Sequence, residues 1–365
     1  ADFNWMPHRS HNVRFGTSYQ FHIYSPSRRS LTTSGTIRDE KSFSQYYQGN
    51  EFSLYAEDEI TVLDRISLNL GLRYAMSAVP GKTWNRLEPR VSINVECCDG
   101  VDFRASYTEM NQFAHLVSTT YLDIPTNCWL PSTAVIAPMH SRQVAAGIYC
   151  RLPLNFRLNV EGWYKTMDNL LEYSGKNALF PPLDAWETSF NKGKGRSYGL
   201  ETEFGWRSQK LSLTAYYTLS WSQRKFEDIW TDWYSHRFDN RHKLTLMGSW
   251  KVSRTVDLYA GWNYNSGGWM TVPTHIYNPG EVFDRVYTKP NNVNLPDYHR
   301  LDIGANFRKV SRRGNEHIWN IGIYNVYCRK NVVFVAVEER DDKTLYGTGR
   351  AIFPIIPSFS YTIKF

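Results

Sequence analysis

The sequence contains no run of about 18 apolar residues, so no transmembrane helix is expected. Cysteine is scarce, at 5 of 365 residues, and no CxxC pair occurs, which excludes a disulfide scaffold and argues against a zinc site. The formal net charge of +7 is modest, and Lys and Arg are spread along the chain, so nucleic-acid binding is not expected. Neither an initiator Met nor a signal peptide precedes Ala1, and we expect a mature or truncated piece of a longer protein.

Aromatic residues, by contrast, are abundant, at 15% of the chain. Side chains of this kind need a surface to bury against, so the composition excludes a disordered chain. Apolar and polar residues also alternate with period two along many segments. Odd-numbered positions from Leu211 to Trp221 are Leu, Leu, Ala, Tyr, Leu and Trp, whereas the even-numbered positions between them are Ser, Thr, Tyr, Thr and Ser. This pattern is typical of β-strands with one apolar and one polar face.

The alternating segments hold their pattern for about nine to twelve residues, which is long for a soluble sheet and suits a tilted crossing of a bilayer. We predict strands over residues 11–24, 50–62, 66–77, 88–97, 101–111, 141–150, 155–167, 196–206, 210–222, 240–251, 254–265, 298–309, 315–328 and 353–365. Short turns near 63–65, 98–100, 151–153, 207–209, 252–253 and 310–315 alternate with long loops near 25–49, 112–140, 168–195, 223–239, 266–297 and 329–352, and only the connection near 78–87 is brief. The sequence therefore predicts an all-β fold, an antiparallel transmembrane β-barrel with short periplasmic turns and long extracellular loops.

The last segment alternates up to the final residue. Its apolar positions include Phe359, Tyr361, Ile363 and Phe365, which we expect to close the barrel and to end on an aromatic side chain at the lipid boundary. Asp58 does not fit this scheme, because it shares a face with Leu54 and Ile60 and a lipid-facing carboxylate is unfavourable. A β-bulge would turn Asp58 away from lipid.

Several segments resemble, in order, strands of TonB-dependent outer-membrane receptors. The similar segments are Glu51–Ile60, Leu70–Tyr74, Leu87–Arg90, Leu295–Gly304, Ile321–Tyr327 and Phe353–Phe365. The resemblance implies a 22-stranded barrel, occluded by an N-terminal plug and driven by the inner-membrane protein TonB. The fourteen predicted strands match the last fourteen of that barrel. Residues 1–365 are accordingly expected to form a partial barrel domain, without the plug and the early strands.

Charged residues lie on the polar face of the predicted strands. They are Glu57, Glu59, Arg73, Arg90, Glu96, Arg104, Glu161, Glu201 and Glu203. One interpretation is that they face the lumen and hydrogen-bond a plug that must later move, and the other is that any water-filled lumen is lined in this way. Carboxylates such as Glu201 and Glu203 recur two residues apart because they share a face, so no catalytic residues are predicted and the protein is not expected to be an enzyme.

The long loops are rich in aromatic residues that lie outside any lipid-facing pattern. The group suits stacking on a sugar ring, a corrinoid or a siderophore, and it also suits packing between loops or against a surface lipoprotein. Contact with a ligand or partner is favoured over loop packing for Tyr121, Trp129, Trp186, Trp230, Trp233, Tyr234 and Trp269. Acidic and His residues in these loops are interpreted as solvated charge, so neither a metal site nor a cofactor is predicted.

The five cysteines fall at the two ends of the strands. Cys97, Cys98 and Cys150 lie at short turns, and Cys128 and Cys328 lie on or near long loops. Because the periplasm is oxidising, a bridge from Cys150 to Cys97 or Cys98 is one hypothesis, and with an odd number at least one thiol is free or pairs with another chain.

The strand pattern predicts an integral protein of the cell outer membrane, and the resemblance implies that it imports a scarce, large nutrient such as a siderophore, corrinoid, haem, glycan or peptide. Its expected partners are outer-membrane lipid and lipopolysaccharide, the TonB complex reached through the plug, the N-terminal part of the receptor and a surface lipoprotein. The alternatives are a complete 14-stranded channel for passive diffusion of hydrophobic or small solutes, a barrel enzyme, and a soluble glycan-binding β-domain.

Overall fold

The computed structural model describes residues 1–24, 46–117, 128–173, 187–277, 284–339, 345–351 and 353–365. Fifteen strands pair in sequence order to form one continuous antiparallel sheet. They are β1 (Asp2–His8), β2 (His11–Tyr24), β3 (Tyr47–Val62), β4 (Ile66–Val79), β5 (Lys82–Cys98), β6 (Val101–Gln112), β9 (Met139–Leu152), β10 (Phe156–Tyr173), β11 (Phe190–Arg207), β12 (Leu211–Phe226), β14 (His242–Lys251), β15 (Val256–Asn265), β20 (Tyr298–Val310), β21 (Glu316–Tyr324) and β24 (Ile356–Lys364).

The remaining elements are short and lie in the connections. β13 (Trp230–Ser235) pairs with β12, and four small hairpins form from β7 (Ala114–Val117) with β8 (Cys128–Pro131), β16 (Trp269–Met270) with β19 (Val293–Asn294), β17 (His275–Tyr277) with β18 (Asp284–Val286), and β22 (Val332–Glu339) with β23 (Leu345–Ala351). A 3-10 turn spans Pro153–Asn155. Among the described residues, no helix is both long and apolar enough to span a membrane.

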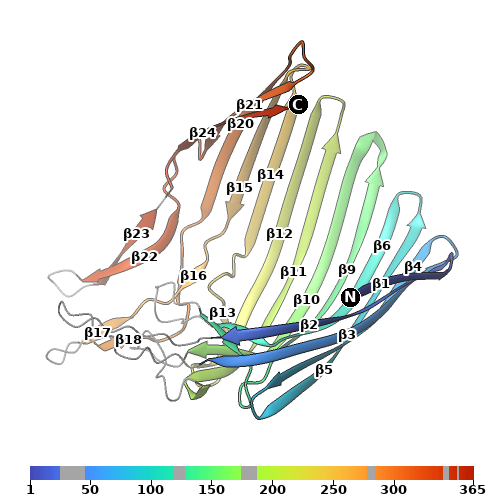
Figure 1. Ribbon diagram of the computed structural model, residues 1–365. Coiled ribbons are helices and arrows are strands. Elements are labelled where there is room, and N and C mark those ends of the chain that lie inside the picture. The colour runs from blue at the N-terminus through green and yellow to red at the C-terminus, as the bar shows by residue number, and fades with distance from the viewer. Residues whose placement is uncertain (25–45, 118–127, 174–186, 278–283, 340–344, 352) are drawn as a thin grey trace.

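The sheet curves into an open trough with the short turns along one end and the small hairpins gathered at the other (Figure 1). β1 and β24 form its two edges, and each pairs with one neighbour only within the part of the chain that the structure describes. The predicted all-β antiparallel architecture is confirmed, and so is the separation of short turns from long connections. The trough is the wall of a barrel that these strands do not close.

All fourteen predicted strands are present, and β1 adds a fifteenth. The largest boundary differences are six residues, at three strands. β10 ends at Tyr173 instead of residue 167, β11 begins at Phe190 instead of residue 196, and β5 begins at Lys82 instead of residue 88. The segment from Lys82 to Leu87 pairs with β4, so the brief connection predicted near 78–87 is a tight turn at Pro80 and Gly81. Gly81 takes a φ of +80°, which a glycine adopts without strain.

The registers assign every side chain to one of two faces. On one face, Leu213, Gly248, Ala260, Ile303 and Ile323 stand opposite one another from strand to strand. On the other face, a row of polar residues crosses the sheet in the same way. We call the first the outer face and the second the inner face. The alternation seen in the sequence therefore extends across the whole sheet as two chemically distinct surfaces.

Asp58 lies on the outer face, and the pairing of β3 with both neighbours is unbroken there, so the bulge that would have turned it away is absent. Its Oδ2 atom lies 2.7 Å from Nδ1 of His11 instead. The carboxylate is tolerated on an apolar surface because it has a hydrogen-bonding partner from the adjacent strand.

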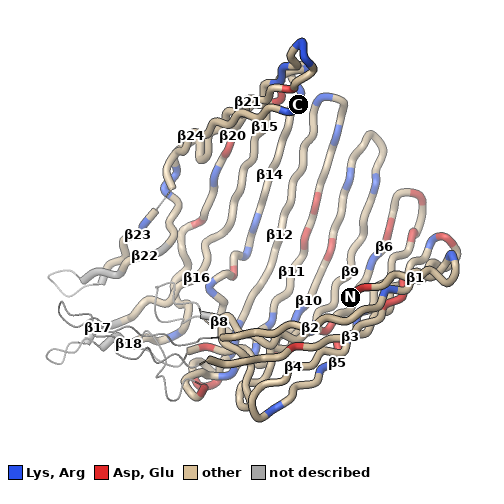
Figure 2. The backbone as a smooth tube through the Cα atoms, in the orientation of Figure 1, with Lys and Arg blue, Asp and Glu red and all other residues tan. Residues whose placement is uncertain are grey.

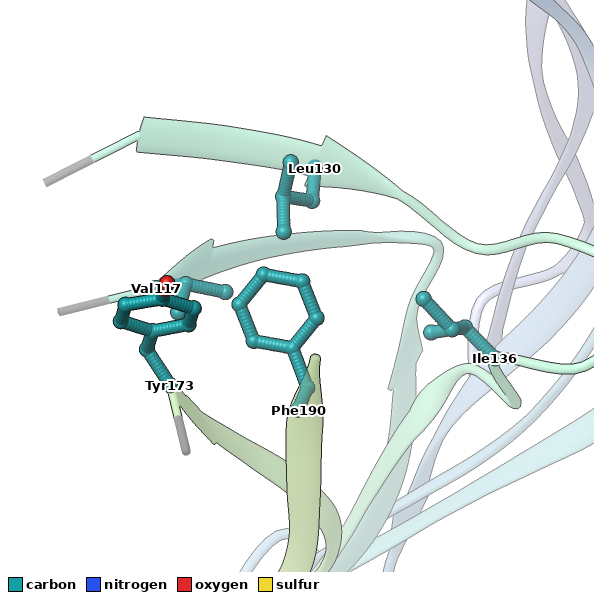
Figure 3. Close-up of a cluster of buried hydrophobic side chains, with 5 residues drawn as sticks. All are labelled: Val117, Leu130, Ile136, Tyr173 and Phe190. Carbon is teal, nitrogen blue, oxygen red and sulfur yellow. The ribbon is translucent and has the colours of Figure 1, made fainter. Parts of the chain in front are cut away.

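The main apolar core does not lie between the strands of the trough. It lies at the end with the long connections, where Val117, Leu130, Ile136, Tyr173 and Phe190 pack together (Figure 3). The ends of β10 and β11 thus extend beyond the trough to support the β7–β8 hairpin.

Candidate functional site: the polar inner face and its loop end

The nine charged residues singled out in the sequence share the inner face. One row across four strands shows the arrangement, because Arg104 on β6 is opposite Gly147, Gly147 is opposite Glu161, and Glu161 is opposite Glu201. The alternating registers place Glu57, Glu59, Arg73, Arg90, Glu96 and Glu203 on this same surface.

Most of these charges have partners on the inner face itself. Arg14 of β2 lies 3.5 Å from both Glu57 and Glu59. Arg157 donates a hydrogen bond to Glu203 at 3.1 Å, and the indole of Trp163 donates to Glu201 at 3.1 Å. These side chains remain part-exposed, so the pairs can exchange for other polar partners at little cost in free energy.

Arg104 and Glu161 meet through a tyrosine. The hydroxyl of Tyr149 donates to Glu161, and the guanidinium of Arg104 lies over the Tyr149 ring at 4.3 Å from its centroid. With Arg14 and Glu59 these residues line a polar cavity of about 460 Å³. The inner face is therefore a hydrogen-bonding surface with a hollow in it.

Glu88, which the sequence reasoning did not select, is the most firmly held charge of this face. It is only 1% exposed, its Oε1 accepts a hydrogen bond from the backbone N–H of Asn111 at 2.7 Å, and its Oε2 lies 3.5 Å from Arg73. Its position two residues from Arg90, in phase with that residue, was the signal available in the sequence. Arg90 and Glu96, in contrast, form no ion pair within the described segments.

The first loop cluster surrounds the β7–β8 hairpin. Phe190 inserts between Val117 and Leu130, with Tyr173 beside it (Figure 3). His115 on β7 is 1% exposed, and its Nε2 lies 3.3 Å from the hydroxyl of Ser132. Burial lowers the pKa of His115 to about 4, so the imidazole is neutral at pH 7.

A second cluster surrounds β13. The guanidinium of Arg196 lies 4.3 Å from the centroid of the Trp233 ring, and Tyr234 is only 2% exposed. Burial, together with the nearby cations Arg224 and Arg237, lowers the pKa of His236 to about 3. The backbone N–H of Trp269 donates to the carbonyl of Arg237 at 3.0 Å, which joins β16 to this cluster.

The structure thus divides the predicted loop aromatics. Trp230, Trp233, Tyr234 and Trp269 belong to the second cluster, whereas Trp129 projects from β8 in the first cluster and is 53% exposed. Tyr121 and Trp186 lie outside the described residues. Contact with a ligand stays a prediction for all seven.

The proposed disulfide is not formed. Cys97, Cys98, Cys150 and Cys328 all have free thiols. Val101 of β6 lies between them: it is opposite Cys98 on β5 and opposite Cys150 on β9. Cys98 and Cys150 are therefore separated by two strand spacings of about 4.8 Å each, which exceeds the Cα–Cα distance that a disulfide can span.

The final strand pairs with β21, where Phe359 is opposite Ile321 and Tyr361 is opposite Trp319. Ile363 is opposite His317, and Phe365, beyond the last pair, is 97% exposed. The other edge of β24 has no partner among the described strands, so closure by this strand stays a prediction.

An antiparallel wall with an apolar outer face, a polar inner face and elaborated loops at one end defines the class of transmembrane β-barrels. The family model described as TonB dependent receptor-like, beta-barrel matches residues 1–326, and the chain belongs to this family. The predicted recognition is therefore confirmed. No curated protein sequence matches the chain.

Solved structures of receptors share this fold at low sequence identity. The ferripyoverdine receptor of Pseudomonas aeruginosa superposes with a TM-score of 0.60 at 17% identity, covering 99% of this chain and 46% of the receptor. BauA, the ferric preacinetobactin receptor of Acinetobacter baumannii, gives 0.61 at 14% identity, with 99% and 52% covered. The ferric-catecholate receptor Fiu of E. coli gives 0.59 at 13% identity, with 96% and 51% covered. The chain spans about half the length of these structures.

Proposed function

We propose that this chain is part of the wall of an outer-membrane receptor that actively imports a scarce, large nutrient, with energy supplied by TonB through a plug domain. The observation that carries the proposal is the inner face, where charges such as Arg14, Glu57 and Glu203 pair within the wall while staying part-exposed. A surface of exchangeable ion pairs suits contact with a plug that must later move, because each pair is worth only about 0–1 kcal/mol. The residues proposed to face the plug are the nine charges of this face that the sequence singled out.

The strand count favours a partial barrel over the passive-channel alternative. Fifteen strands that pair antiparallel in sequence order leave β1 and β24 running in the same direction. Antiparallel closure needs an even number, so these strands cannot close by themselves in that way. We propose that about seven further strands from the remaining part of the receptor complete a 22-stranded barrel, and that the plug belongs to the same part.

The intact mass of the purified protein tests this division. We expect a polypeptide or a stable complex of nearly twice 42.6 kDa. A lone 42.6 kDa species that stays folded in cold detergent would contradict the partial barrel and support a passive channel.

Ferric siderophores are the cargo we place first. Three solved receptors with this fold carry ferripyoverdine, ferric preacinetobactin or a ferric catecholate in their names. Exposed aromatic side chains at the loop end, above all Trp129, can stack on the planar groups of such ligands. Corrinoid, haem, glycan and peptide stay in the set of candidate cargoes, and a surface lipoprotein stays a candidate partner of the loops.

Uptake of iron-55 complexed with pyoverdine, preacinetobactin or enterobactin, each measured in cells with and without TonB, tests the function. We expect uptake of at least one complex to need both this chain and TonB, and Trp129→Ala to raise the apparent KM. Trp206→Ala is the matched control, because Trp206 lies beside the short turn at the opposite end of β11. Uptake that persists without TonB would contradict active transport.

A further inference from the structure

The outer face carries a groove over its last strands, between β12 and β21. Two rows of opposed residues line it, one running from Leu211 through Trp250 and Leu258, and the next from Gly248 through Ala260 to Ile303. The groove has a volume of about 510 Å³ and is almost wholly apolar. This volume lies in the range of small-molecule binding sites.

Residue size explains the hollow. The base of the groove is formed by the small residues Gly248, Ala260 and Ala305. Its sides are formed by larger residues, among them Trp250 and Ile321. A second hollow of about 390 Å³ shares Gly248 and Ala260 with the first and extends the groove toward β11. An elongated apolar channel of this kind matches a hydrocarbon chain more closely than it matches a compact ligand.

An aromatic group separates the groove from the short-turn end. Ala305 is followed on the same face by Phe307, which is opposite Trp319, and Trp319 is opposite Tyr361. The ring centroids of Trp319 and Tyr361 lie 5.6 Å apart. Amphipathic rings of this type occupy the boundary between hydrocarbon and headgroups.

Beyond the aromatic group lies a basic turn. Lys309 follows Phe307 on the outer face, and Arg312 and Arg313 belong to the β20–β21 turn, where Figure 2 shows basic residues gathered. The nearby carboxylates already have partners, because Asp257 lies 2.8 Å from Arg308 and Glu316 lies 3.4 Å from Lys364.

Lys309, Arg312 and Arg313 are exposed and form no ion pair within the part of the chain that the structure describes. Along β20, Lys309 stands about 13 Å from Ala305, since each residue advances about 3.3 Å. The three unpaired cations thus lie beyond the end of the groove at about the distance of a lipid headgroup from its acyl chain. The aromatic group lies between these cations and the groove.

We propose that this surface binds an anionic phospholipid of the periplasmic leaflet, with one acyl chain in the groove and the phosphate at Lys309, Arg312 and Arg313. Three unpaired cations favour a net-negative headgroup over a zwitterionic one, because each Lys or Arg near a charged headgroup contributes about 1 kcal/mol. The continuity of groove, aromatic boundary and basic turn favours a lipid over free phosphate or a second copy of the chain.

Native mass spectrometry of the whole detergent-purified receptor, titrated with dioleoylphosphatidylglycerol or dioleoylphosphatidylethanolamine, tests the site. We expect the glycerol lipid to bind at least about tenfold more tightly. The triple variant Lys309→Gln/Arg312→Gln/Arg313→Gln should abolish that preference. The matched control removes three exposed charges from short turns remote from the groove, as Arg9→Gln/Arg65→Gln/Arg151→Gln, and should retain it.

The groove is tested separately by filling it. Ala260→Phe should weaken phosphatidylglycerol binding at least about fivefold while leaving the cold-detergent fold intact. Ala146→Phe makes the same change in a different hollow of the outer face, away from the basic turn, and should not weaken it. The proposal would be overturned if the two lipids bound equally, or if the variants and their controls lost the same amount of binding. It would also be overturned if glycerophosphoglycerol alone competed for the site, or if the protein formed a dimer that Ala260→Phe dissociates.

Discussion

The charged side chains of the inner face differ widely in how far they are buried and hydrogen-bonded, and Glu88 is the most buried of those described here. Its buried carboxylate accepts hydrogen bonds from the backbone N–H of Asn111 and from Arg73. Glu88→Ala is expected to lower the free energy of unfolding by about 1–3 kcal/mol, because the part-buried N–H of Asn111 and the Arg73 guanidinium both lose their acceptor. Urea unfolding in lipid vesicles, followed by tryptophan fluorescence, measures this loss.

Glu59→Ala is the matched control for that variant. The Glu59 side chain is 44% exposed and lies 3.5 Å from Arg14. Its loss should change the free energy of unfolding by no more than about 1 kcal/mol. Equal losses in the two variants would contradict the distinction between a fixed and an exchangeable charge.

His115 makes the first loop cluster sensitive to pH. Its pKa of about 4 when buried lies below the 6.5 of an exposed imidazole, so the opened hairpin binds more protons than the closed one as the pH falls. The stability that the closed hairpin gains by burying a neutral imidazole is therefore fully present above pH 6.5 and is lost as the pH falls toward 4. At pH 5 the loss is about 2 kcal/mol, equivalent to roughly 30-fold more opening than at pH 7.5.

Hydrogen exchange of the β7–β8 hairpin at pH 7.5 and pH 5, corrected for intrinsic rates, checks this effect. His115→Gln keeps a polar group beside Ser132 and does not titrate, so its protection should be the same at both values. Acid-induced opening of the same size in His115→Gln would mean that another group is responsible.

At the scale of elements, two glycines on neighbouring strands differ in whether they can be replaced by a larger residue. A Cβ atom at Gly304 of β20 would lie 2.2 Å from the ring of Tyr259, whereas a Cβ atom at Gly261 of β15 would meet nothing within 4 Å. Gly304→Val should cost about 1–3 kcal/mol, since Tyr259 must leave its position. Gly261→Val should be neutral or slightly stabilising in a strand. Urea unfolding of both variants tests the difference, and similar values would contradict it.

The alternation of side chains predicts the elements well and their partners poorly. It located every strand of the main sheet path except β1, because one face must be apolar throughout. It shortened β5, since Lys82, Asn85 and Arg86 read as a polar connection when the cross-strand pairs with β4 are unknown. It wrongly suggested a bulge at Asp58, because the hydrogen-bonding partner of this carboxylate, His11, lies on another strand and cannot be identified from the alternation.

The buried polar residues show the same limit within the candidate site. Glu88 and His115 look like ordinary polar residues in the sequence, and only the contacts with Asn111 and Ser132 reveal that they are held in place. The shared face of Arg104, Glu161 and Glu201 was predictable, since period two alone fixes it.

For the molecule as a whole, the assignment of faces can be tested with one pair of variants in the middle of β14. Leu246 is on the outer face opposite Trp262, and Thr245 is on the inner face opposite Asn263. Leu246→Arg should cost about 2–4 kcal/mol in a bilayer, because the charge enters hydrocarbon, and Thr245→Arg should cost less than about 1 kcal/mol. Unfolding in vesicles gives both values, and a reversed order would mean that the faces are exchanged.

The length of the central strands has a further consequence. β10 and β11 each have 18 residues, and their ladder continues to the pair of Tyr173 with Phe190. A tilted crossing needs only about 9–11 residues, so the upper part of this wall rises on the order of 15 Å above the hydrocarbon. The small core around Phe190 therefore assembles in water, where burial of apolar surface is favourable as it is in a soluble protein. Loop conformation and bilayer insertion are thus governed by different solvents within one continuous strand.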